Sequence, residues 1–252
     1  MKTVLRTVSI AVLALAVASC GDKAAEKTAD KTVDTAAAAV PAAANPAGSD
    51  WTKTFAATPE GGFRIGNPEA KVKLVEFASL TCPHCREFHE TGMATIRDKY
   101  VASGNVSYEF RNFVLNGPDY AASMLARCQG AEAFFGLLGS FYNDQATWVE
   151  PFTKLTEADN KRLAGLSEDQ QVAALAELGQ LDAYVRARGI PRAKFDQCLA
   201  DKAALAKLAA LRTEATEKYK LTGTPGFIIN EVTQEGVYTW ADLEPKLKAA
   251  LS

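Results

Sequence analysis

The spacing of apolar residues divides the chain into three parts. An apolar run from Val8 to Ala18 follows a basic start, and a polar, alanine-rich stretch continues to about residue 58. From residue 59 onward the chain has the recurring apolar positions of a folded protein. Short apolar runs bounded by Gly, Pro or Asn are typical of strands, and Pro is favoured in the first turn of a helix. These signals predict strands at 63–65, 72–77 and 106–114, and a helix from Pro83 to Tyr100.

A long helical block interrupts this α/β pattern. From residue 119 to 220, apolar residues recur at spacings of three and four, as they do along the buried face of a helix. Strands are predicted again at 227–229 and 237–238, and a last helix from Trp240 to Leu251. We therefore expect an α/β domain of residues 59–118 and 221–252, with an all-helical domain of residues 119–220 inserted into it.

The first 19 residues have the layout of a secretory signal peptide, with a basic start, an apolar run and small residues before Cys20. The run is short for a transmembrane helix. Val17 to Cys20 resembles the bacterial lipobox, in which the cysteine is lipidated; ordinary cleavage that leaves an untethered protein is the alternative. Residues 20–58 hold few large apolar side chains, so we expect a flexible tether.

The charge balance argues against a nucleic-acid partner. The chain has 28 basic and 30 acidic residues, a net charge of −2, and loss of residues 1–19 would make it slightly more acidic. Basic residues form no stripe along the sequence. No nucleotide, flavin or haem motif is present, so we expect no cofactor and electron transfer through thiols alone.

The strongest chemical signal is the motif Cys82-Pro83-His84-Cys85 at the start of the predicted helix. Two cysteines at this spacing can close a disulfide, and the thiolate is the reacting species. The unpaired N–H groups and the helix dipole favour the anion of Cys82, and His84 adds a cation or hydrogen-bond donor. A stabilised thiolate makes the disulfide more oxidising. Cys85, one turn further, is expected to be shielded and to resolve mixed disulfides.

A metal half-site is the competing interpretation of this motif, because His89 extends the ligand-like spacing of Cys82 and Cys85. A closed zinc site usually needs a second ligand pair, and no second Cys-x-x-Cys or His pair exists in the chain. We therefore expect no metal and place His89 on the helix surface.

The motif and its surroundings resemble DsbA-type thiol:disulfide oxidoreductases of the thioredoxin superfamily. The resemblance is carried by Cys-Pro-His-Cys, by the strand ending at Glu76-Phe77 before it, by the helical insertion, and by Gly223-Thr224-Pro225 far downstream. It implies a thioredoxin fold with an inserted helical domain. It also implies that Pro225 is a cis-proline packed against the dithiol and that the Thr224 backbone pairs with substrate polypeptide.

Glu76 has a further role under this resemblance, as a buried carboxylate that relays protons to and from Cys85. Burial raises the pKa of a carboxyl group and so makes that role possible. Two alternatives stay open from the sequence: an ordinary trans bond before Pro225, and a solvent-facing Glu76. The family includes reductases and isomerases, and threonine before the proline is found among them, so the direction of electron flow also stays open.

Two cysteines are left over after Cys20 and the Cys-Pro-His-Cys motif. Cys128 and Cys198 both lie in the helical block, and spare cysteines of an exported protein tend to pair. Some DsbA relatives carry a bridge in this domain. We expect a structural disulfide between them, with two unpaired buried thiols as the alternative.

These observations predict a protein-disulfide oxidoreductase that works most simply as a dithiol oxidase. Its expected partners are unfolded or thiol-containing exported proteins and a membrane redox partner. We expect a monomer that is lipid-anchored on the periplasmic side of a bacterial membrane. A reductase or isomerase for a dedicated client, and a metal-handling module using Cys82, Cys85 and His89, are the alternative functions.

Overall fold

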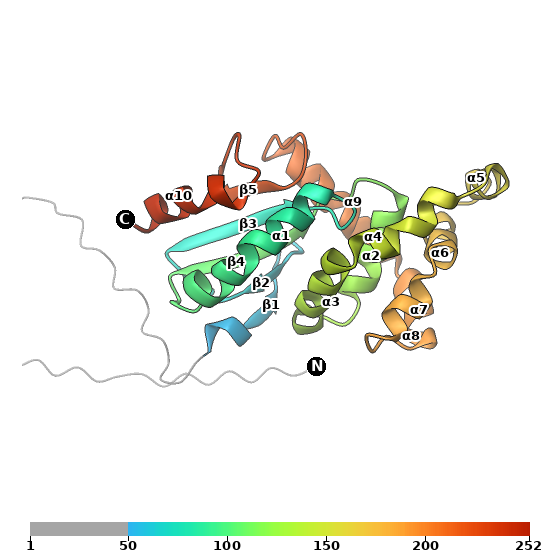
Figure 1. The fold of residues 1–252 in the computed structure, drawn as a ribbon, viewed down its shortest axis with the longest axis horizontal. Helices are drawn as coiled ribbons and strands as arrows, with labels where there is room; N and C mark the ends of the chain where they lie inside the picture. The colour runs from blue at the N-terminus through green and yellow to red at the C-terminus, as the bar shows by residue number, and fades with distance from the viewer. Residues whose placement is uncertain (1–49) are drawn as a thin grey trace, which may run out of the picture. The chain divides into compact units, whose positions relative to one another are not determined.

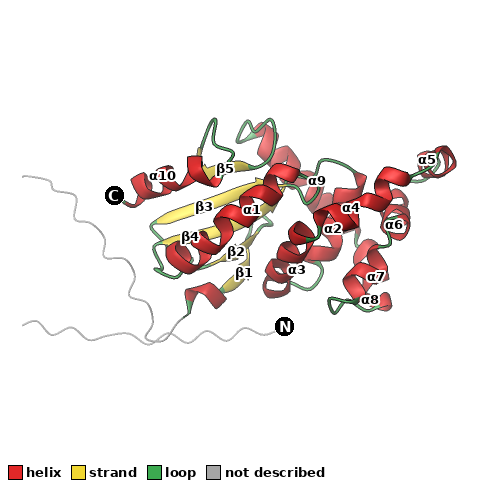
Figure 2. Ribbon diagram, viewed as in Figure 1, coloured by secondary structure: helices red, strands yellow, loops and turns green. Residues whose placement is uncertain are grey.

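The computed structural model describes residues 50–252, which form a six-stranded mixed sheet with helices packed on it (Figures 1 and 2). The strands are β1 (Phe55–Ala57), β2 (Phe63–Ile65), β3 (Val72–Ala78), β4 (Val106–Asn112), β5 (Gly226–Ile229) and β6 (Val232–Thr233). Within these residues, no helix is long and apolar enough to cross a membrane. The predicted signal peptide, residues 1–19, and the predicted lipidation site, Cys20, lie outside the described residues.

The sheet has the strand order β1-β2-β4-β3-β5-β6. β3 and β4 are parallel, and all other neighbours are antiparallel. The parallel connection is made by helix α1 (Pro83–Thr95), which continues into a π-helical turn, η2 (Ile96–Val101). β3 is therefore central, and its end delivers the chain directly into the start of α1.

Side chains alternate between the two faces of β3. Val72, Leu74 and Ala78 face the larger core, which they share with Cys85 and Phe88 of α1. The opposite face is covered by a smaller apolar cluster of Val75, Phe77, Phe113, Ala215, Tyr219 and Ile228. Glu76 lies in register on the face that carries α1, although its neighbours there are apolar.

The chain between β4 and β5 is helical in all its regular elements, as predicted. Figure 2 shows these helices beside and behind the strands. They are α2 (Gly117–Arg127), α3 (Ala131–Asn143), α4 (Gln145–Val149), α5 (Glu157–Ala164), α6 (Glu168–Leu178), α7 (Leu181–Arg186), α8 (Arg192–Leu199) and α9 (Lys202–Glu217), with the 3₁₀ turn η3 (Glu150–Lys154) after α4. The last helix, α10, spans Trp240–Leu251.

The helical segment and the sheet share one continuous core. Phe134 of α3 packs against Phe63 of β2 and Phe110 of β4, with ring centroids 4.5 and 5.4 Å apart. The last helix of this segment, α9, ends at Glu217, within three residues of the expected boundary at 220. Glu214 of α9 accepts a 3.0 Å hydrogen bond from Arg111 of β4, and the end of α9 covers the sheet. The helical segment is therefore inserted between β4 and β5 in the sequence, but it packs against the sheet and does not form a separate domain.

The predicted flexible tether, residues 20–58, extends too far, because regular structure begins at Trp51. Residues 51–53 form a 3₁₀ turn, η1 (Trp51–Lys53), and β1 pairs with β2. Phe55 packs against Phe135 of α3 at 5.6 Å, and the indole of Trp51 lies over Gly104, where a side chain would collide with it. These few aromatic contacts order the chain from Trp51 onward, although the composition around them is polar.

A second correction concerns the predicted strand at 237–238, which is absent. β5 instead pairs with β6 through a turn at Asn230 and Glu231, both with positive φ. Val237 is buried and Tyr238 is exposed, which is the alternation typical of a strand, but these two residues pair with no strand of the sheet within residues 50–252.

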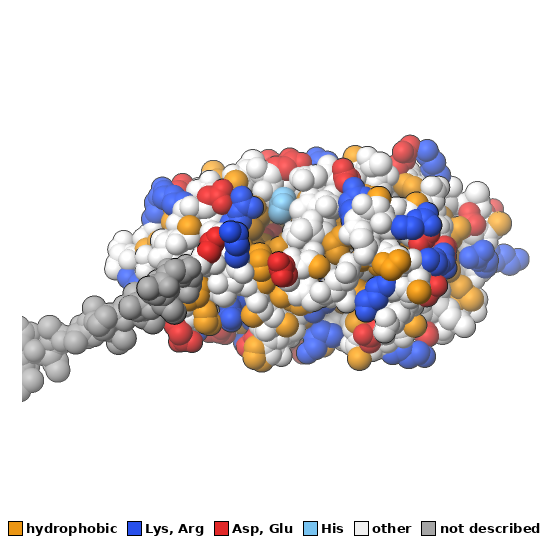
Figure 3. Space-filling view, turned by 90° about the horizontal axis from the view of Figure 1, so that it is seen from below, with side chains coloured by type: hydrophobic (Ala, Val, Ile, Leu, Met, Phe, Trp, Pro, Cys, Tyr) orange, Lys and Arg blue, Asp and Glu red, His pale blue; other side chains and the backbone are white. Residues whose placement is uncertain are grey.

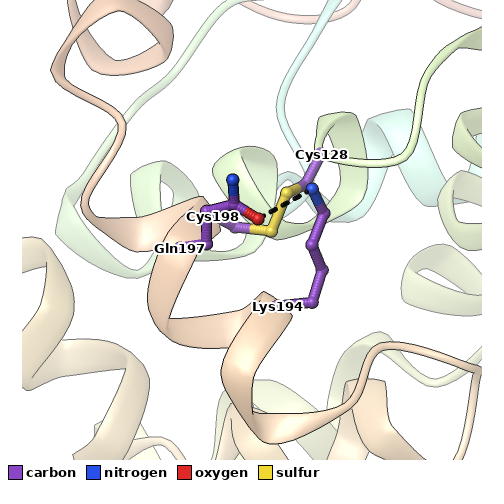
Figure 4. Close-up of a disulfide and its surroundings, with 4 residues drawn as sticks. All are labelled: Cys128, Lys194, Gln197 and Cys198. Carbon is purple, nitrogen blue, oxygen red and sulfur yellow. Dashed lines mark hydrogen bonds between the residues drawn. A yellow bond between two sulfur atoms is a disulfide. The ribbon is translucent and has the colours of Figure 1, made fainter.

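Cys128 and Cys198 are joined by a disulfide, with Cα atoms 5.6 Å apart (Figure 4). The bridge links the end of α2 to α8 across 70 residues of sequence. Lys194 and Gln197 lie beside it on α8, and the lysine ammonium donates to the glutamine side chain at 3.1 Å. The bridge therefore ties α8 to the end of α2, the first helix after β4.

Removal of this bridge is expected to destabilise the fold strongly. A loop of 70 residues corresponds to about 4 kcal/mol in the chain-entropy account of cross-links. We expect a Cys128→Ser/Cys198→Ser variant to unfold at a clearly lower urea concentration than the parent. Both proteins should also carry Cys82→Ser and Cys85→Ser, so that only this bridge differs. Equal midpoints would contradict the prediction.

Candidate functional site

The dithiol lies where β3 ends and α1 begins. Cys82 occupies the N-cap of α1 in extended conformation, and Pro83 fills the first helical position, where its missing N–H costs nothing. Cys82 is 6% exposed and Cys85 is fully buried. Both thiols are free in this structure. Both cysteines are therefore buried, Cys85 completely, and the expected shielding of Cys85 is confirmed.

The Cys82 sulfur is stabilised as an anion. The main cause is a hydrogen bond from the Cys85 thiol. The Thr224 side chain and the backbone N–H groups at the start of α1 act in the same direction, and burial opposes them. Together they lower the pKa of Cys82 to about 5. The outer thiol is therefore ionised at neutral pH.

Cys85 has the opposite character. Burial, followed by its interaction with Cys82 and the charge of Glu76, raises the pKa of Cys85 well above its usual range. A buried thiol of this kind needs a base before it can act as a nucleophile. The two sulfurs thus divide the chemistry into a reactive anion and a protonated resolving thiol.

The loop before β5 completes the site. The bond between Thr224 and Pro225 is cis, and Pro225 is buried. The Thr224 carbonyl oxygen lies 3.4 Å from the Cys82 sulfur and accepts a hydrogen bond from it when the thiol is protonated. The structure therefore brings Thr224, which lies 142 positions after Cys82, next to the motif, and the cis bond to Pro225 follows it directly.

Glu76 lies on β3, on the face that packs against α1, and is only 2% exposed. Burial raises the pKa of Glu76 to about 8, although a hydrogen bond from the Tyr108 hydroxyl opposes the shift. The solvent-facing alternative for Glu76 is therefore wrong. A carboxyl group with this pKa can exchange protons near neutral pH.

Two expectations about histidines are not met. The His84 side chain is 75% exposed and its Nδ1 lies 3.8 Å from Glu87, so His84 acts on Cys82 through its backbone N–H rather than its imidazole. His89 is half-buried, not on the surface. Its ring lies 5.1 Å from that of Tyr142, and burial lowers the pKa of His89 to about 4.

His89 also lines a cavity of about 460 Å³ between α1 and α3. His89 does not form a set of metal ligands with Cys82 and Cys85. Within residues 50–252, no group of three or more His, Cys, Asp or Glu side chains is placed to hold a metal ion. Figure 3 shows acidic and basic side chains intermixed on one face of the molecule, as the charge balance suggested.

Three buried side chains of the helical segment hold the loop that leads into the motif, and sequence inspection missed them. Asp119 of α2 accepts from the Ser79 hydroxyl at 2.5 Å and from the Leu80 N–H at 3.0 Å. Tyr142 of α3 donates to the Ser79 carbonyl at 3.2 Å. The third is Gln145, at the start of α4.

The Gln145 amide donates to two backbone carbonyls of the loop, that of Leu80 at 2.8 Å and that of Cys82 at 3.0 Å. It is buried, so both bonds form away from water. Position alone gave little warning of these roles. Asp119 is an ordinary acidic residue in a first helical turn, and Gln145 is the first residue of the short helix α4.

Known proteins with similar sequences and folds are consistent with this site. The family model described as Thioredoxin matches residues 58–249. The chain belongs to the thioredoxin family. The crystal structure of a protein-disulfide isomerase from Novosphingobium aromaticivorans is 35% identical, with a TM-score of 0.72, and the match covers 75% of this chain and 96% of that one. The predicted thioredoxin fold with a helical insertion is therefore confirmed.

Two more distant proteins are also similar to this chain. A Rickettsia bellii protein, provisionally named a protein-disulfide oxidoreductase, is 30% identical over 186 residues, which are 73% of this chain and 63% of that protein. The chain thus spans less than two thirds of that relative. Wolbachia pipientis α-DsbA1 is 23% identical with a TM-score of 0.61, covers 80% of this chain and 96% of its own, and shows a shared fold.

The raised pKa of Glu76 predicts a stability profile that its amide variant lacks. The folded-state pKa of about 8 lies above the ordinary value of 4.5, so the folded protein holds this proton more tightly than the unfolded chain. The wild type therefore loses unfolding free energy as pH rises from about 4.5 to 8 on account of this group. We expect Glu76→Gln to become more stable relative to wild type across that window.

Urea unfolding of both reduced proteins at several pH values measures this difference. The midpoint difference between Glu76→Gln and wild type should grow with pH and level off once Glu76 is ionised. An exposed-carboxylate variant, Glu87→Gln, controls for the general effect of removing a negative charge. A difference that is constant with pH would show that Glu76 ionises normally.

Proposed function

We propose that this protein exchanges disulfides with thiol-containing protein substrates through Cys82, and that it does so as a dithiol oxidase. Membership of the thioredoxin family and the names of its relatives support protein-disulfide exchange. The observation that carries the direction of the reaction is the stabilised thiolate of Cys82. Stabilising the reduced form of a dithiol makes its disulfide a stronger oxidant.

The reaction begins from the Cys82–Cys85 disulfide. A substrate thiolate attacks the Cys82 sulfur and forms a mixed disulfide. The Cys82–Cys85 bond breaks, and Cys85 leaves with the electron pair and takes a proton. A second substrate thiolate then attacks the substrate sulfur of the mixed disulfide, and Cys82 leaves as a thiolate. Because a thiol of low pKa leaves faster, the surroundings of Cys82 favour this last step.

The loop at Thr224 and Pro225 supplies the place for the substrate chain. The Thr224 carbonyl lies beside the Cys82 sulfur, and β5 begins immediately after Pro225. An extended substrate segment that pairs with this backbone would present its cysteine to Cys82. This role of Thr224 and Pro225 belongs to the proposal.

A second candidate activity is disulfide isomerisation, which the name of the Novosphingobium aromaticivorans relative favours. An isomerase must leave from mixed disulfides without oxidising every dithiol that it meets, so its potential is less extreme than that of an oxidase. The strongly lowered pKa of Cys82 weighs toward the oxidase. The reduction potential of the Cys82/Cys85 pair distinguishes an oxidase from an isomerase and from a reductase.

The reduction potential of the Cys82/Cys85 pair tests the proposal. Equilibration of residues 50–252 with a glutathione series should give a potential more oxidising than about −180 mV, the value typical of protein disulfide isomerase. Ultraviolet absorbance of the thiolate should titrate in the reduced protein with a midpoint of about 5. A potential near that of thioredoxin, about −270 mV, would make the protein a reductase and overturn the oxidase assignment.

We further propose that the protein is exported and lipid-anchored at Cys20, on the periplasmic side of a bacterial membrane, where a membrane partner reoxidises it. The lipobox-like segment from Val17 to Cys20 supports this location. The Cys128–Cys198 bridge supports it independently, because structural disulfides persist in oxidising compartments.

A Cys20→Ala variant tests the anchor. In a bacterial host, the wild-type chain should partition into the detergent phase, and mass spectrometry should find acyl chains on Cys20. The variant is expected to lose the acyl mass and to move to the aqueous phase. Cys82→Ser leaves Cys20 and the Cys128–Cys198 bridge in place and serves as the matched control. An unmodified wild-type N-terminus after cleavage would show that the protein is secreted without an anchor.

A further inference from the structure

The buried acid beneath the dithiol has one hydrogen-bond partner. Glu76 on β3 and Tyr108 on β4 belong to neighbouring parallel strands, in which Leu74 is paired with Tyr108. Tyr108 is therefore diagonal to Glu76 on the same face of the sheet. Its hydroxyl donates to Oε2 of Glu76 at 2.5 Å, and Oε1 is buried without a hydrogen-bond partner.

Within residues 50–252, no cation is among the groups that compensate the charge of Glu76. The groups that shift the pKa of Glu76 are burial, the Tyr108 hydroxyl and the charge of Cys82, and none of them is basic. From α1 the pair faces Cys82 and Cys85, and from α3 it faces Tyr142, whose hydroxyl is committed to the Ser79 carbonyl. β5 carries no titratable side chain between Gly226 and Ile229.

We propose that Tyr108 is a positioning residue for proton exchange with Cys85: by occupying Oε2 of Glu76, its hydroxyl leaves Oε1 as the oxygen that takes and returns the proton. The inference rests on disulfide exchange as the proposed function. When Cys85 attacks a mixed disulfide at Cys82, the Cys85–Cys82 bond forms and the substrate sulfur leaves with the electron pair. The proton of Cys85 passes to Oε1. In the opposite direction, Oε1–H returns it to the leaving Cys85 sulfur.

The hydroxyl of Tyr108 also sets how readily Glu76 ionises. It donates to the carboxylate and is the group that opposes the rise in the pKa of Glu76. Without it, the carboxylate would lose its one hydrogen bond in a buried site. The base for Cys85 would then be available only at higher pH.

The experiment uses the reduced protein and an aromatic disulfide reagent, Ellman's reagent. Cys82 attacks first and releases one thionitrobenzoate; Cys85 then resolves the mixed disulfide and releases the second. The rate of the second release should rise with pH through the ionisation of Glu76. We expect Tyr108→Phe to move the midpoint of this rise upward by about one pH unit or more, the size of a lost hydrogen bond to a charged group.

Two further proteins make the result specific. Tyr100→Phe removes a similar tyrosine–glutamate bond, 2.8 Å from Tyr100 to Glu244, away from the dithiol, and should leave the midpoint unchanged. In a Glu76→Gln background the pH dependence should be lost, and adding Tyr108→Phe should change nothing more. A shift that persists without Glu76, or an unshifted Tyr108→Phe protein, overturns the inference.

The outcome is independent of the oxidase assignment. The assay contains no substrate protein or redox partner, so a reducing potential would remove the proposed direction and leave this test intact. Thermal unfolding checks that Tyr108→Phe is folded. Should it unfold, the infrared C=O stretch of Glu76 in the wild type, assigned by its loss in Glu76→Gln, reports the same bond. A frequency typical of a carboxyl without a hydrogen bond would also overturn the inference.

Discussion

The reactive end of this protein depends on hydrogen bonds that hold four residues of backbone, Ser79 to Cys82. This segment joins the central strand to α1 and so places the Cys82 sulfur at a helix N-terminus. Its carbonyl and N–H groups are bound by Asp119, Tyr142 and Gln145, all from the helical segment. Because these partners are buried, losing one would leave an unsatisfied polar group inside the fold. The helical segment is therefore part of the site, because its side chains hold the backbone that places Cys82.

The same loop geometry separates the properties of two chemically identical thiols. Cys82, at the helix start, meets donors and becomes an anion, whereas Cys85, one turn deeper, meets apolar side chains and the field of Glu76. The difference in position is a single helical turn. In the proposed reaction this difference in acidity favours the last step, in which Cys82 leaves, since a sulfur of lower pKa is the better leaving group.

Much of this could be predicted from the sequence because the relevant signals are local. Pro83 after Cys82 is typical of a helix start, and apolar runs located β3 and β4 within one or two residues. The limit of the tether was wrong because isolated contacts, such as that of Trp51 over Gly104, decide it. The limits of the helical segment, by contrast, lie within three residues of those predicted. Tyr108 and Gln145 act through parallel register and tertiary packing, which no local pattern reports.

The two buried carboxyl groups near the dithiol show how the number of donors separates structure from chemistry. Asp119 accepts four hydrogen bonds, from Ser79, Leu80, Leu115 and Ser123, and its pKa rises only to about 6.

Glu76 is equally buried but accepts one, and its pKa rises to about 8. A carboxylate surrounded by donors is fixed as an anion and serves as an anchor for backbone. One with a free oxygen keeps its proton loosely enough to give it away near neutral pH. The contrast favours Glu76, rather than the better-connected Asp119, as the acid proposed to exchange protons with Cys85.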